Sequence, residues 1–202
     1  MTDVPSCEPA APADCQDDLP LALRVHTSLA HQRLERSLDL HGRLRDKLRF
    51  VGVLERFFGF HLVWEAAIAE RPSLREFHRP RRRVAALAQD LLALGHTQAR
   101  IDSLPSCSEA SALAASDGAA LGSMYVMEGS TLGGQLITRA LLTSAWAPQG
   151  GLGYFDPYGR RTGEMWREFK DWLVRHPGAA ERRCVLEGAR GAFDLLHDWV
   201  SG

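Results

Sequence analysis

Apolar side chains recur along this chain at intervals of three and four residues, the spacing that gathers them on one face of an α-helix. The sequence has no sustained alternation of apolar and polar residues, the pattern of a half-buried strand, and no internal repeat. It therefore predicts an all-α protein. The expected helices cover residues 20–38, 48–70, 82–94, 108–121 leading into 125–144, 162–175 and 178–199.

Turn and capping signals set the boundaries of these helices. Pro20 suits a first helical turn, Arg71-Pro72 ends the second helix, and Gly95 ends the third. Residues 102–108 and 148–159 are rich in turn formers and predict links. Residues 1–19 are rich in Pro, Ala, Asp and Ser and predict a disordered or loosely ordered tail, which leaves 20–202 as one domain.

The same patterns predict which side chains are buried. In the first helix the core-facing stripe is expected to contain Leu21, Val25, Leu29 and Leu38, with Leu34 beside it. A basic cluster formed by Arg79 and residues 81–83 is expected to be a solvated turn. Five histidines in loops or polar contexts are interpreted as surface residues: His41, His78, His96, His176 and His197.

Composition narrows the class of protein. The formal net charge of −1 gives no electrostatic footprint for nucleic acid or for an anionic membrane. No apolar run approaches the ~20 residues that span a bilayer, and the N-terminus lacks the pattern of a secretory signal. The cysteines show no C-x-x-C spacing, which argues against a disulfide framework and a zinc site and favours a reducing cytoplasm. They are Cys7, Cys15, Cys107 and Cys184.

Residues 125–135 (YVMEGSTLGGQ) place three glycines inside an otherwise helical segment. Each costs roughly 1 kcal/mol against alanine, so Gly129, Gly133 and Gly134 together cost about 3 kcal/mol unless they serve a purpose. Gly129 and Gly133 are four residues apart and share one face. One interpretation is a kinked helix that offers bare main chain to a flat ligand. The other is tight helix packing or a break between two helices, and spacing alone does not separate them.

His31 is the second candidate, because it shares a helix face with Thr27, Leu34 and Glu35. A lone histidine on an apolar face more often packs than binds a ligand, so both interpretations stay open, as they do for His61. His26 lies about 140° around the helix and should point elsewhere. No G-x-S-x-G elbow, P-loop, H-E-x-x-H or strand-linked G-x-G-x-x-G is present, nor are paired Glu-x-x-His motifs.

Two of these segments carry a family resemblance. Residues 23–35 (LRVHTSLAHQRLE) resemble the first helix of the haem oxygenases, and 125–135 resemble the distal helix of that family. The likeness is greatest to the biliverdin-producing bacterial enzymes associated with bacteriophytochromes. Weaker stretches at 83–95, 153–173 and 187–199 agree in order, so the resemblance covers roughly residues 20–200.

The resemblance implies a single-domain haem oxygenase-like helical bundle that sandwiches haem between a proximal and a distal helix. His31 would be the proximal iron ligand, and Glu35 would orient its imidazole. Ser130 stands where the animal enzymes carry an aspartate that anchors proton-delivering water, which leaves the proton route open. The remaining implied site residues are Gly129, Gly133 and Gly134 on the distal side, and Arg24, Thr27, Tyr125, Arg167 and Phe193 around the haem, with Arg24 and Arg167 near its propionates.

The implied reaction is oxidative cleavage of haem, which is substrate and cofactor at once, to biliverdin, carbon monoxide and ferrous iron. It uses O2 and electrons from an external ferredoxin or flavodoxin reductase-type donor, and a bacteriophytochrome is a candidate biliverdin acceptor. Three alternatives remain: a haem carrier that does not turn over, a thiaminase-like or cofactor-maturation enzyme of similar fold, and a purely structural bundle. The last leaves the glycines unexplained.

Overall fold

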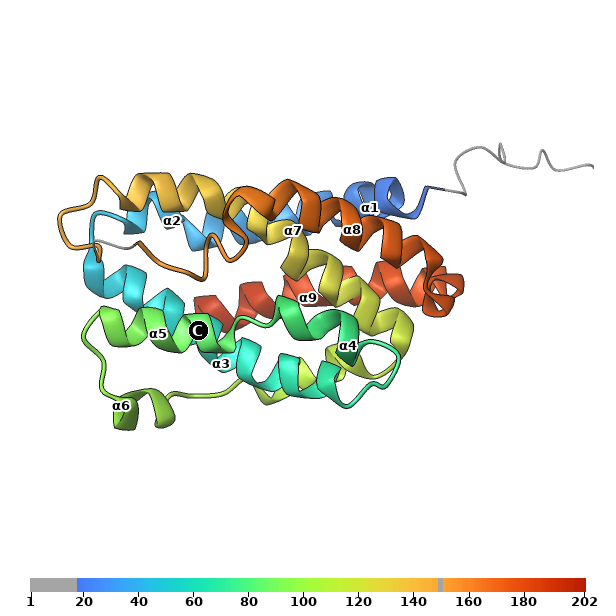
Figure 1. The fold of residues 1–202 in the computed structure, drawn as a ribbon, viewed down its shortest axis with the longest axis horizontal. Coiled ribbons are helices and arrows are strands. Elements are labelled where there is room, and N and C mark those ends of the chain that lie inside the picture. Colours follow the sequence, from blue (N-terminus) through green and yellow to red (C-terminus); the bar gives the residue numbers. More distant parts are fainter. Residues whose placement is uncertain (1–17, 149–150) are drawn as a thin grey trace, which may run out of the picture.

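The computed structural model describes residues 18–148 and 151–202, without the side chains of His41 and Pro177. Within these ranges every regular element is helical, which confirms the all-α prediction (Figure 1). The predicted tail falls mostly on residues 1–17, outside the described ranges. The elements are α1 (Leu19–Leu38), α2 (Leu40–Arg43), α3 (Lys47–Ala69), α4 (Arg75–His78), η2 (Arg79–Arg81), α5 (Val84–Ala93), α6 (Gln98–Asp102), η3 (Ser108–Ala114), α7 (Asp117–Leu141), η4 (Gly159–Arg161), α8 (Thr162–Arg175), η5 (Pro177–Ala180) and α9 (Arg182–Ser201), where η marks 3-10 helix.

Local chemistry explains where the long helices begin. The Asp18 carboxylate accepts a hydrogen bond from the Leu21 N–H and caps α1, with Pro20 in the first turn. Asp46 caps α3 in the same way, by accepting from the Leu48 and Arg49 N–H groups. The predicted spans 48–70 and 162–175 agree with α3 and α8 to within a residue.

Two predicted helices are interrupted. The segment expected as helix from residue 108 is a 3-10 helix that stops at Ala114, and α7 begins anew where the Ser116 hydroxyl accepts from the Ala119 N–H. The last helix likewise begins at Arg182, after the short η5. By contrast, α7 passes through all three distal glycines without interruption, so they do not separate two helices; Figure 1 shows the helix bending along its length.

Helix α9 runs through the middle of the bundle, and α1 and α7 make their most extensive contacts with it (Figure 1). Two glycines bring the α7 and α9 main chains together. A Cβ on Gly122 would lie 2.1 Å from the Val185 carbonyl oxygen, and one on Gly188 would lie 2.4 Å from the Ala119 carbonyl oxygen. Both positions therefore exclude a side chain, and the crossing fixes α7 against α9.

The predicted core stripe of α1 is wrong for three residues. Leu21, Val25 and Leu29 are 49%, 67% and 77% exposed, and the helix packs through a neighbouring stripe. That buried stripe consists of Leu19, Leu23, Thr27, Leu34 and Leu38. Thr27 can be buried because its hydroxyl donates to the Leu23 carbonyl oxygen at 2.7 Å. Helix α1 thus carries two apolar stripes, and periodicity alone does not tell which one meets α9.

The expected solvated turn at 79–83 is also wrong in part. Arg79 is exposed, but Arg81 and Arg83 are 4% and 2% exposed and reach buried carboxylates on α3 and α7. His78, interpreted as a surface residue, is buried edge-on against the Trp64 ring. His96 is half-buried and bonds Glu55. None of the helices in the described part of the chain is long and apolar enough to cross a bilayer.

Candidate functional site

His31 projects from the side of α1 that is not packed on the core, and its side chain is 52% exposed. Two neighbours orient the imidazole. Its Nε2 lies 3.4 Å from the Glu35 carboxylate one turn later, and its ring meets Phe193 of α9 edge to face at 5.3 Å. No described residue hydrogen-bonds the other ring nitrogen. The Glu35 carboxylate therefore lies near one ring nitrogen, and the other nitrogen has no partner among the described residues.

The predicted distal glycines of α7 divide into two kinds. A Cβ on Gly134 would lie 2.1 Å from the Phe155 carbonyl oxygen, so this glycine permits close packing of the main chain. A Cβ on Gly133 would meet nothing within 4 Å, and one on Gly129 would meet only the Trp166 ring, at 3.7 Å. The packing interpretation thus accounts for Gly134 but not for Gly129 and Gly133.

The face that bears Gly133 is apolar and open to solvent. Leu132 and Leu136, its neighbours on the helix surface, are 44% and 57% exposed. Large exposed aliphatic side chains beside bare main chain form the kind of surface that a flat apolar ligand covers.

Helices α1 and α7 both pack on α9. Burial raises the pKa of the Tyr125 phenol on α7, and the positive charge of Arg24 on α1 opposes that rise. In Figure 1 both helices run in the same direction.

Helix α8 closes one side of the site with aromatic and cationic groups. The Trp166 ring packs on Tyr125 at 5.4 Å, and the Lys170 ammonium lies 5.8 Å from the Trp166 ring centre. Arg167 is exposed and forms no ion pair with a described residue. Arg24 is likewise exposed and has no such ion pair. Unpaired guanidinium groups suit the carboxylates of a ligand.

Ser130 follows the first distal glycine, and its hydroxyl makes two hydrogen bonds within the protein. It donates to the Met127 carbonyl oxygen at 2.7 Å and accepts from Arg83 Nη1 at 3.0 Å. A hydroxyl has one donor and two acceptor positions, so one acceptor position remains for water. Arg83 is the site residue that the sequence analysis missed. A signal for it existed: Glu65 and Glu128 each interrupt an apolar helix and need a buried cationic or N–H partner.

Those two carboxylates hold Arg83 in place. Glu128, directly before Gly129, lies 3.5 Å from Arg83 and 3.4 Å from Arg81, and it accepts from the Tyr158 hydroxyl at 2.8 Å. Glu65 accepts from the Arg83 N–H at 2.6 Å. Burial alone would raise the pKa of Glu65, but its bonds to His61 and to the Arg83 N–H keep it below the usual value.

Two other candidates lie away from this site. His61 is 1% exposed and bridges Glu65 and Tyr154 in the core, which is the packing role rather than the ligand role. Thr27 is in the buried stripe of α1. The structure brings His31 and Glu35 of α1 together with Phe193 of α9, and it brings Tyr125 and Gly129 of α7 together with Trp166 of α8.

These residues fit a haem group. An imidazole with one unengaged nitrogen suits its iron, a helix face without side chains suits the flat ring, and unpaired arginines suit its propionates.

Two known proteins are similar to this chain. A "Heme oxygenase" of Xanthomonas campestris pv. campestris (strain 8004) is 37% identical over 123 residues, which cover 58% of this chain and 66%, slightly under two thirds, of that protein. The structure titled "Structure of Heme Oxygenase from Leptospira interrogans" superposes with a TM-score of 0.76 at 20% identity, over 91% of this chain and 98% of that one, and shows a common fold.

A sequence profile extends the match over nearly the whole chain. Residues 17–202 match the family described as "Heme oxygenase". The match includes all four helices that carry candidate site residues, α1, α7, α8 and α9. This chain therefore belongs to the haem oxygenase family.

Proposed function

We propose that this protein is a haem oxygenase that cleaves haem to biliverdin, carbon monoxide and ferrous iron, using O2 and electrons from an external donor. One observation carries the proposal: Gly129 and Gly133 lie inside a helix with no close packing to explain them, in a chain that also has a solvent-accessible histidine with a carboxylate neighbour. A purely structural bundle would gain stability from alanine at both positions.

Each side chain has a defined part in this proposal. His31 binds the haem iron, and the Glu35 carboxylate, 3.4 Å from Nε2 in the haem-free protein, orients the imidazole. Phe193 limits rotation of the same ring. Arg24 and Arg167 hold the propionates. Haem supplies the redox-active iron and the carbon skeleton that is cleaved.

On the distal side the protein contributes space and a fixed hydroxyl. The bare main chain of Gly129 and Gly133 leaves room for O2 between the helix and the ring. Ser130, held by Arg83, offers its remaining acceptor position to a water molecule and so orients that water toward the ring. Gly134 acts indirectly, by seating α7 on the Phe155 main chain.

The proposal extends to two partners. The electrons come from a ferredoxin or flavodoxin reductase-type system, and a bacteriophytochrome is a candidate acceptor of the biliverdin. Replacing ascorbate by each purified reductase system tests the first partner. Transfer of the bilin to an apo-phytochrome tests the second.

The central experiment adds haemin to the purified protein and follows the Soret band, then supplies ascorbate or a reductase system under air. A stoichiometric Soret complex that converts to biliverdin is expected. A Soret band without conversion would indicate a haem carrier, and no Soret band would contradict haem binding altogether.

His31→Ala tests the assigned ligand, and His26→Ala is its matched control on the exposed surface of the same helix. The first variant should lose most of the ferric complex and its turnover, with recovery on addition of imidazole. The second should behave as the parent protein does. Full activity of His31→Ala without imidazole would show that another residue binds the iron.

A further inference from the structure

A continuous series of aromatic rings leads from the distal glycines to the protein surface along α8. The Trp166 ring lies against Gly129 and is followed by Phe169 at 5.7 Å, with the two planes 13° apart. Phe169 lies 6.3 Å from both Phe77 and Trp172, which stack on each other at 3.9 Å and 4°. His176 ends the series, 4.9 Å from Trp172.

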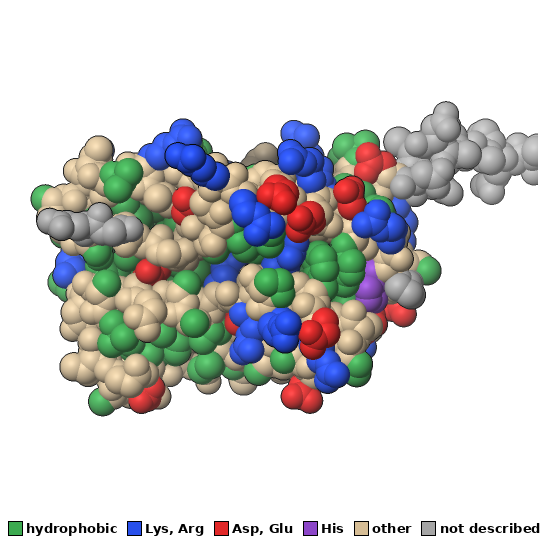
Figure 2. Space-filling model, viewed as in Figure 1, with side chains coloured by type: hydrophobic (Ala, Val, Ile, Leu, Met, Phe, Trp, Pro, Cys, Tyr) green, Lys and Arg blue, Asp and Glu red, His purple; other side chains and the backbone are tan. Residues whose placement is uncertain are grey.

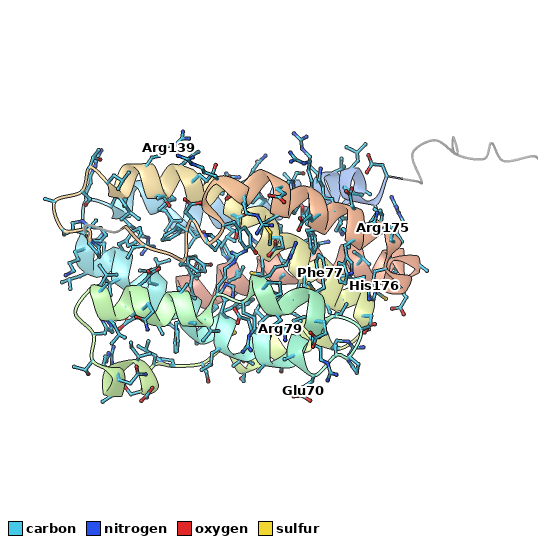
Figure 3. All side chains as sticks on the ribbon, in the orientation of Figure 1. Glu70, Phe77, Arg79, Arg139, Arg175 and His176 are labelled. Carbon is cyan, nitrogen blue, oxygen red and sulfur yellow. The ribbon has the colours of Figure 1, made fainter. Side chains whose placement is uncertain are left out.

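The outer end of this series is accessible. Phe77 and Trp172 are each only partly buried, and Figure 3 places Phe77 and His176 near each other between α4 and α8. Figure 2 shows apolar side chains reaching the surface in this region. The inner end, Trp166, is also only partly buried. Both ends of the series are therefore only partly shielded from solvent.

The two tryptophans of α8 differ from the other three in the hydrogen bonding of the indole N–H group. Trp64 donates to the Ser123 hydroxyl at 2.9 Å, Trp146 to the Leu44 carbonyl at 2.9 Å, and Trp199 to the Arg56 carbonyl at 2.7 Å. Among the described residues, Trp166 and Trp172 have no such acceptor. A tryptophan that loses an electron becomes strongly acidic at this N–H, so an N–H open to water can release its proton.

We propose that Trp166 and Trp172 form a relay that carries oxidising equivalents from the haem site to the protein surface. The relay rests on the proposed function and adds a protective one. Its oxidant is hydrogen peroxide, which accepts two electrons and two protons to give two molecules of water. Each passage through the relay supplies one of these electrons, so two passages consume one peroxide.

The transfer of one electron through the relay takes three steps, over which electrons and protons balance. Trp166 gives one electron to the haem site and releases its Nε1 proton to water, forming a neutral indolyl radical. Trp172 returns an electron to Trp166, which regains a proton, and Trp172 releases its own. A small reductant such as ascorbate or a thiol then gives Trp172 an electron and a proton at the surface. Phe169 and Phe77 are not oxidised and serve as the contact between the two indoles.

Freeze-quenched electron paramagnetic resonance of the ferric haem complex mixed with hydrogen peroxide tests the relay. We expect an indolyl radical whose signal narrows when the tryptophans carry ring deuterium, and oxidation of Trp172 detected by peptide mass spectrometry. Trp166→Phe should remove the oxidation at Trp172. Trp172→Phe should leave a radical on Trp166 and make peroxide bleach the haem faster.

Trp199→Phe is the matched control, because its indole lies outside the series, and it should leave the radical unchanged. A signal that is insensitive to tryptophan deuteration, or Trp172 oxidation that persists in Trp166→Phe, would overturn the relay. Absence of the Soret complex would contradict the proposed function and the relay together. A Soret complex without an indolyl radical would contradict the relay alone.

Discussion

Replacing Gly133 with alanine should make the protein more stable and a poorer enzyme. The added Cβ meets nothing within 4 Å, so it carries no steric cost in the ligand-free protein. A glycine-to-alanine change inside a helix is worth about 1 kcal/mol, which for a chain of this size corresponds to a rise in melting temperature of roughly 2–4 °C. The same methyl group would project into the space proposed for the haem ring and O2.

The two effects are measured separately. Thermal unfolding of the haem-free protein gives the stability, and biliverdin formation at saturating haem gives the turnover, which should fall on the order of tenfold or more because the reactants are displaced. Gly134→Ala is the matched control in the same helix. Its Cβ would lie 2.1 Å from the Phe155 carbonyl oxygen, so it should destabilise the protein by about 1–3 kcal/mol.

Either of two results would refute this reasoning. If Gly133→Ala destabilised the haem-free protein, the glycine would have a packing role that the structure does not contain. If it raised stability and left turnover unchanged, the bare face of α7 would not be where haem and O2 bind.

Three further predictions concern charge. Burial lowers the pKa of His78 from its ordinary value of 6.5 to about 4. Between these pH values the unfolded chain therefore binds more protons than the folded protein does. The free energy of unfolding should fall by ~2 kcal/mol from pH 7 to pH 5. Urea unfolding should show a shallower pH dependence in His78→Phe, and an equal dependence would contradict this assignment. Arg83→Met should lower the free energy of unfolding by about 3 kcal/mol, because it leaves Glu128 with one cation fewer in the core; a loss below about 1 kcal/mol would show that the pair is not buried. Arg167→Ala should weaken haem binding roughly tenfold but leave binding of haem dimethyl ester unchanged, since the ester has no carboxylates to pair; equal loss for both ligands would exclude the propionate role.

The helices are predictable from the sequence wherever a residue fixes the backbone locally. Pro20, the Arg71-Pro72 step and Gly95 mark ends that the structure reproduces closely. The break at Ser116 was missed, because a serine N-cap inside an apolar run looks like an ordinary helical position until its hydroxyl is seen bonded to the Ala119 N–H.

Burial was harder to predict, because it depends on partners far along the chain. The stripe of Leu21, Val25 and Leu29 is as regular as the buried one, and only the position of α9 decides between them. Arg83 looks like part of a solvated basic turn until Glu65 and Glu128 are brought to it from other helices.

The candidate site, too, was only partly predictable from the sequence. The histidine and the glycines could be singled out from the sequence, because a helix-interior glycine is costly wherever it occurs. Their separation into Gly134, which packs, and Gly129 and Gly133, which do not, required the structure, since it depends on where the Phe155 main chain lies. The role of Trp166 beside Gly129 depends in the same way on the packing of α8 against α7.

A crystal structure of the ferric haem complex tests directly whether the porphyrin lies between α1 and the bare face of α7. We predict an iron–nitrogen bond to His31, the main chain of Gly129 and Gly133 as the nearest protein atoms on the opposite face, and propionates directed toward Arg24 and Arg167. Iron bound by any other histidine, or a ring lying outside the space between these two helices, would contradict this prediction.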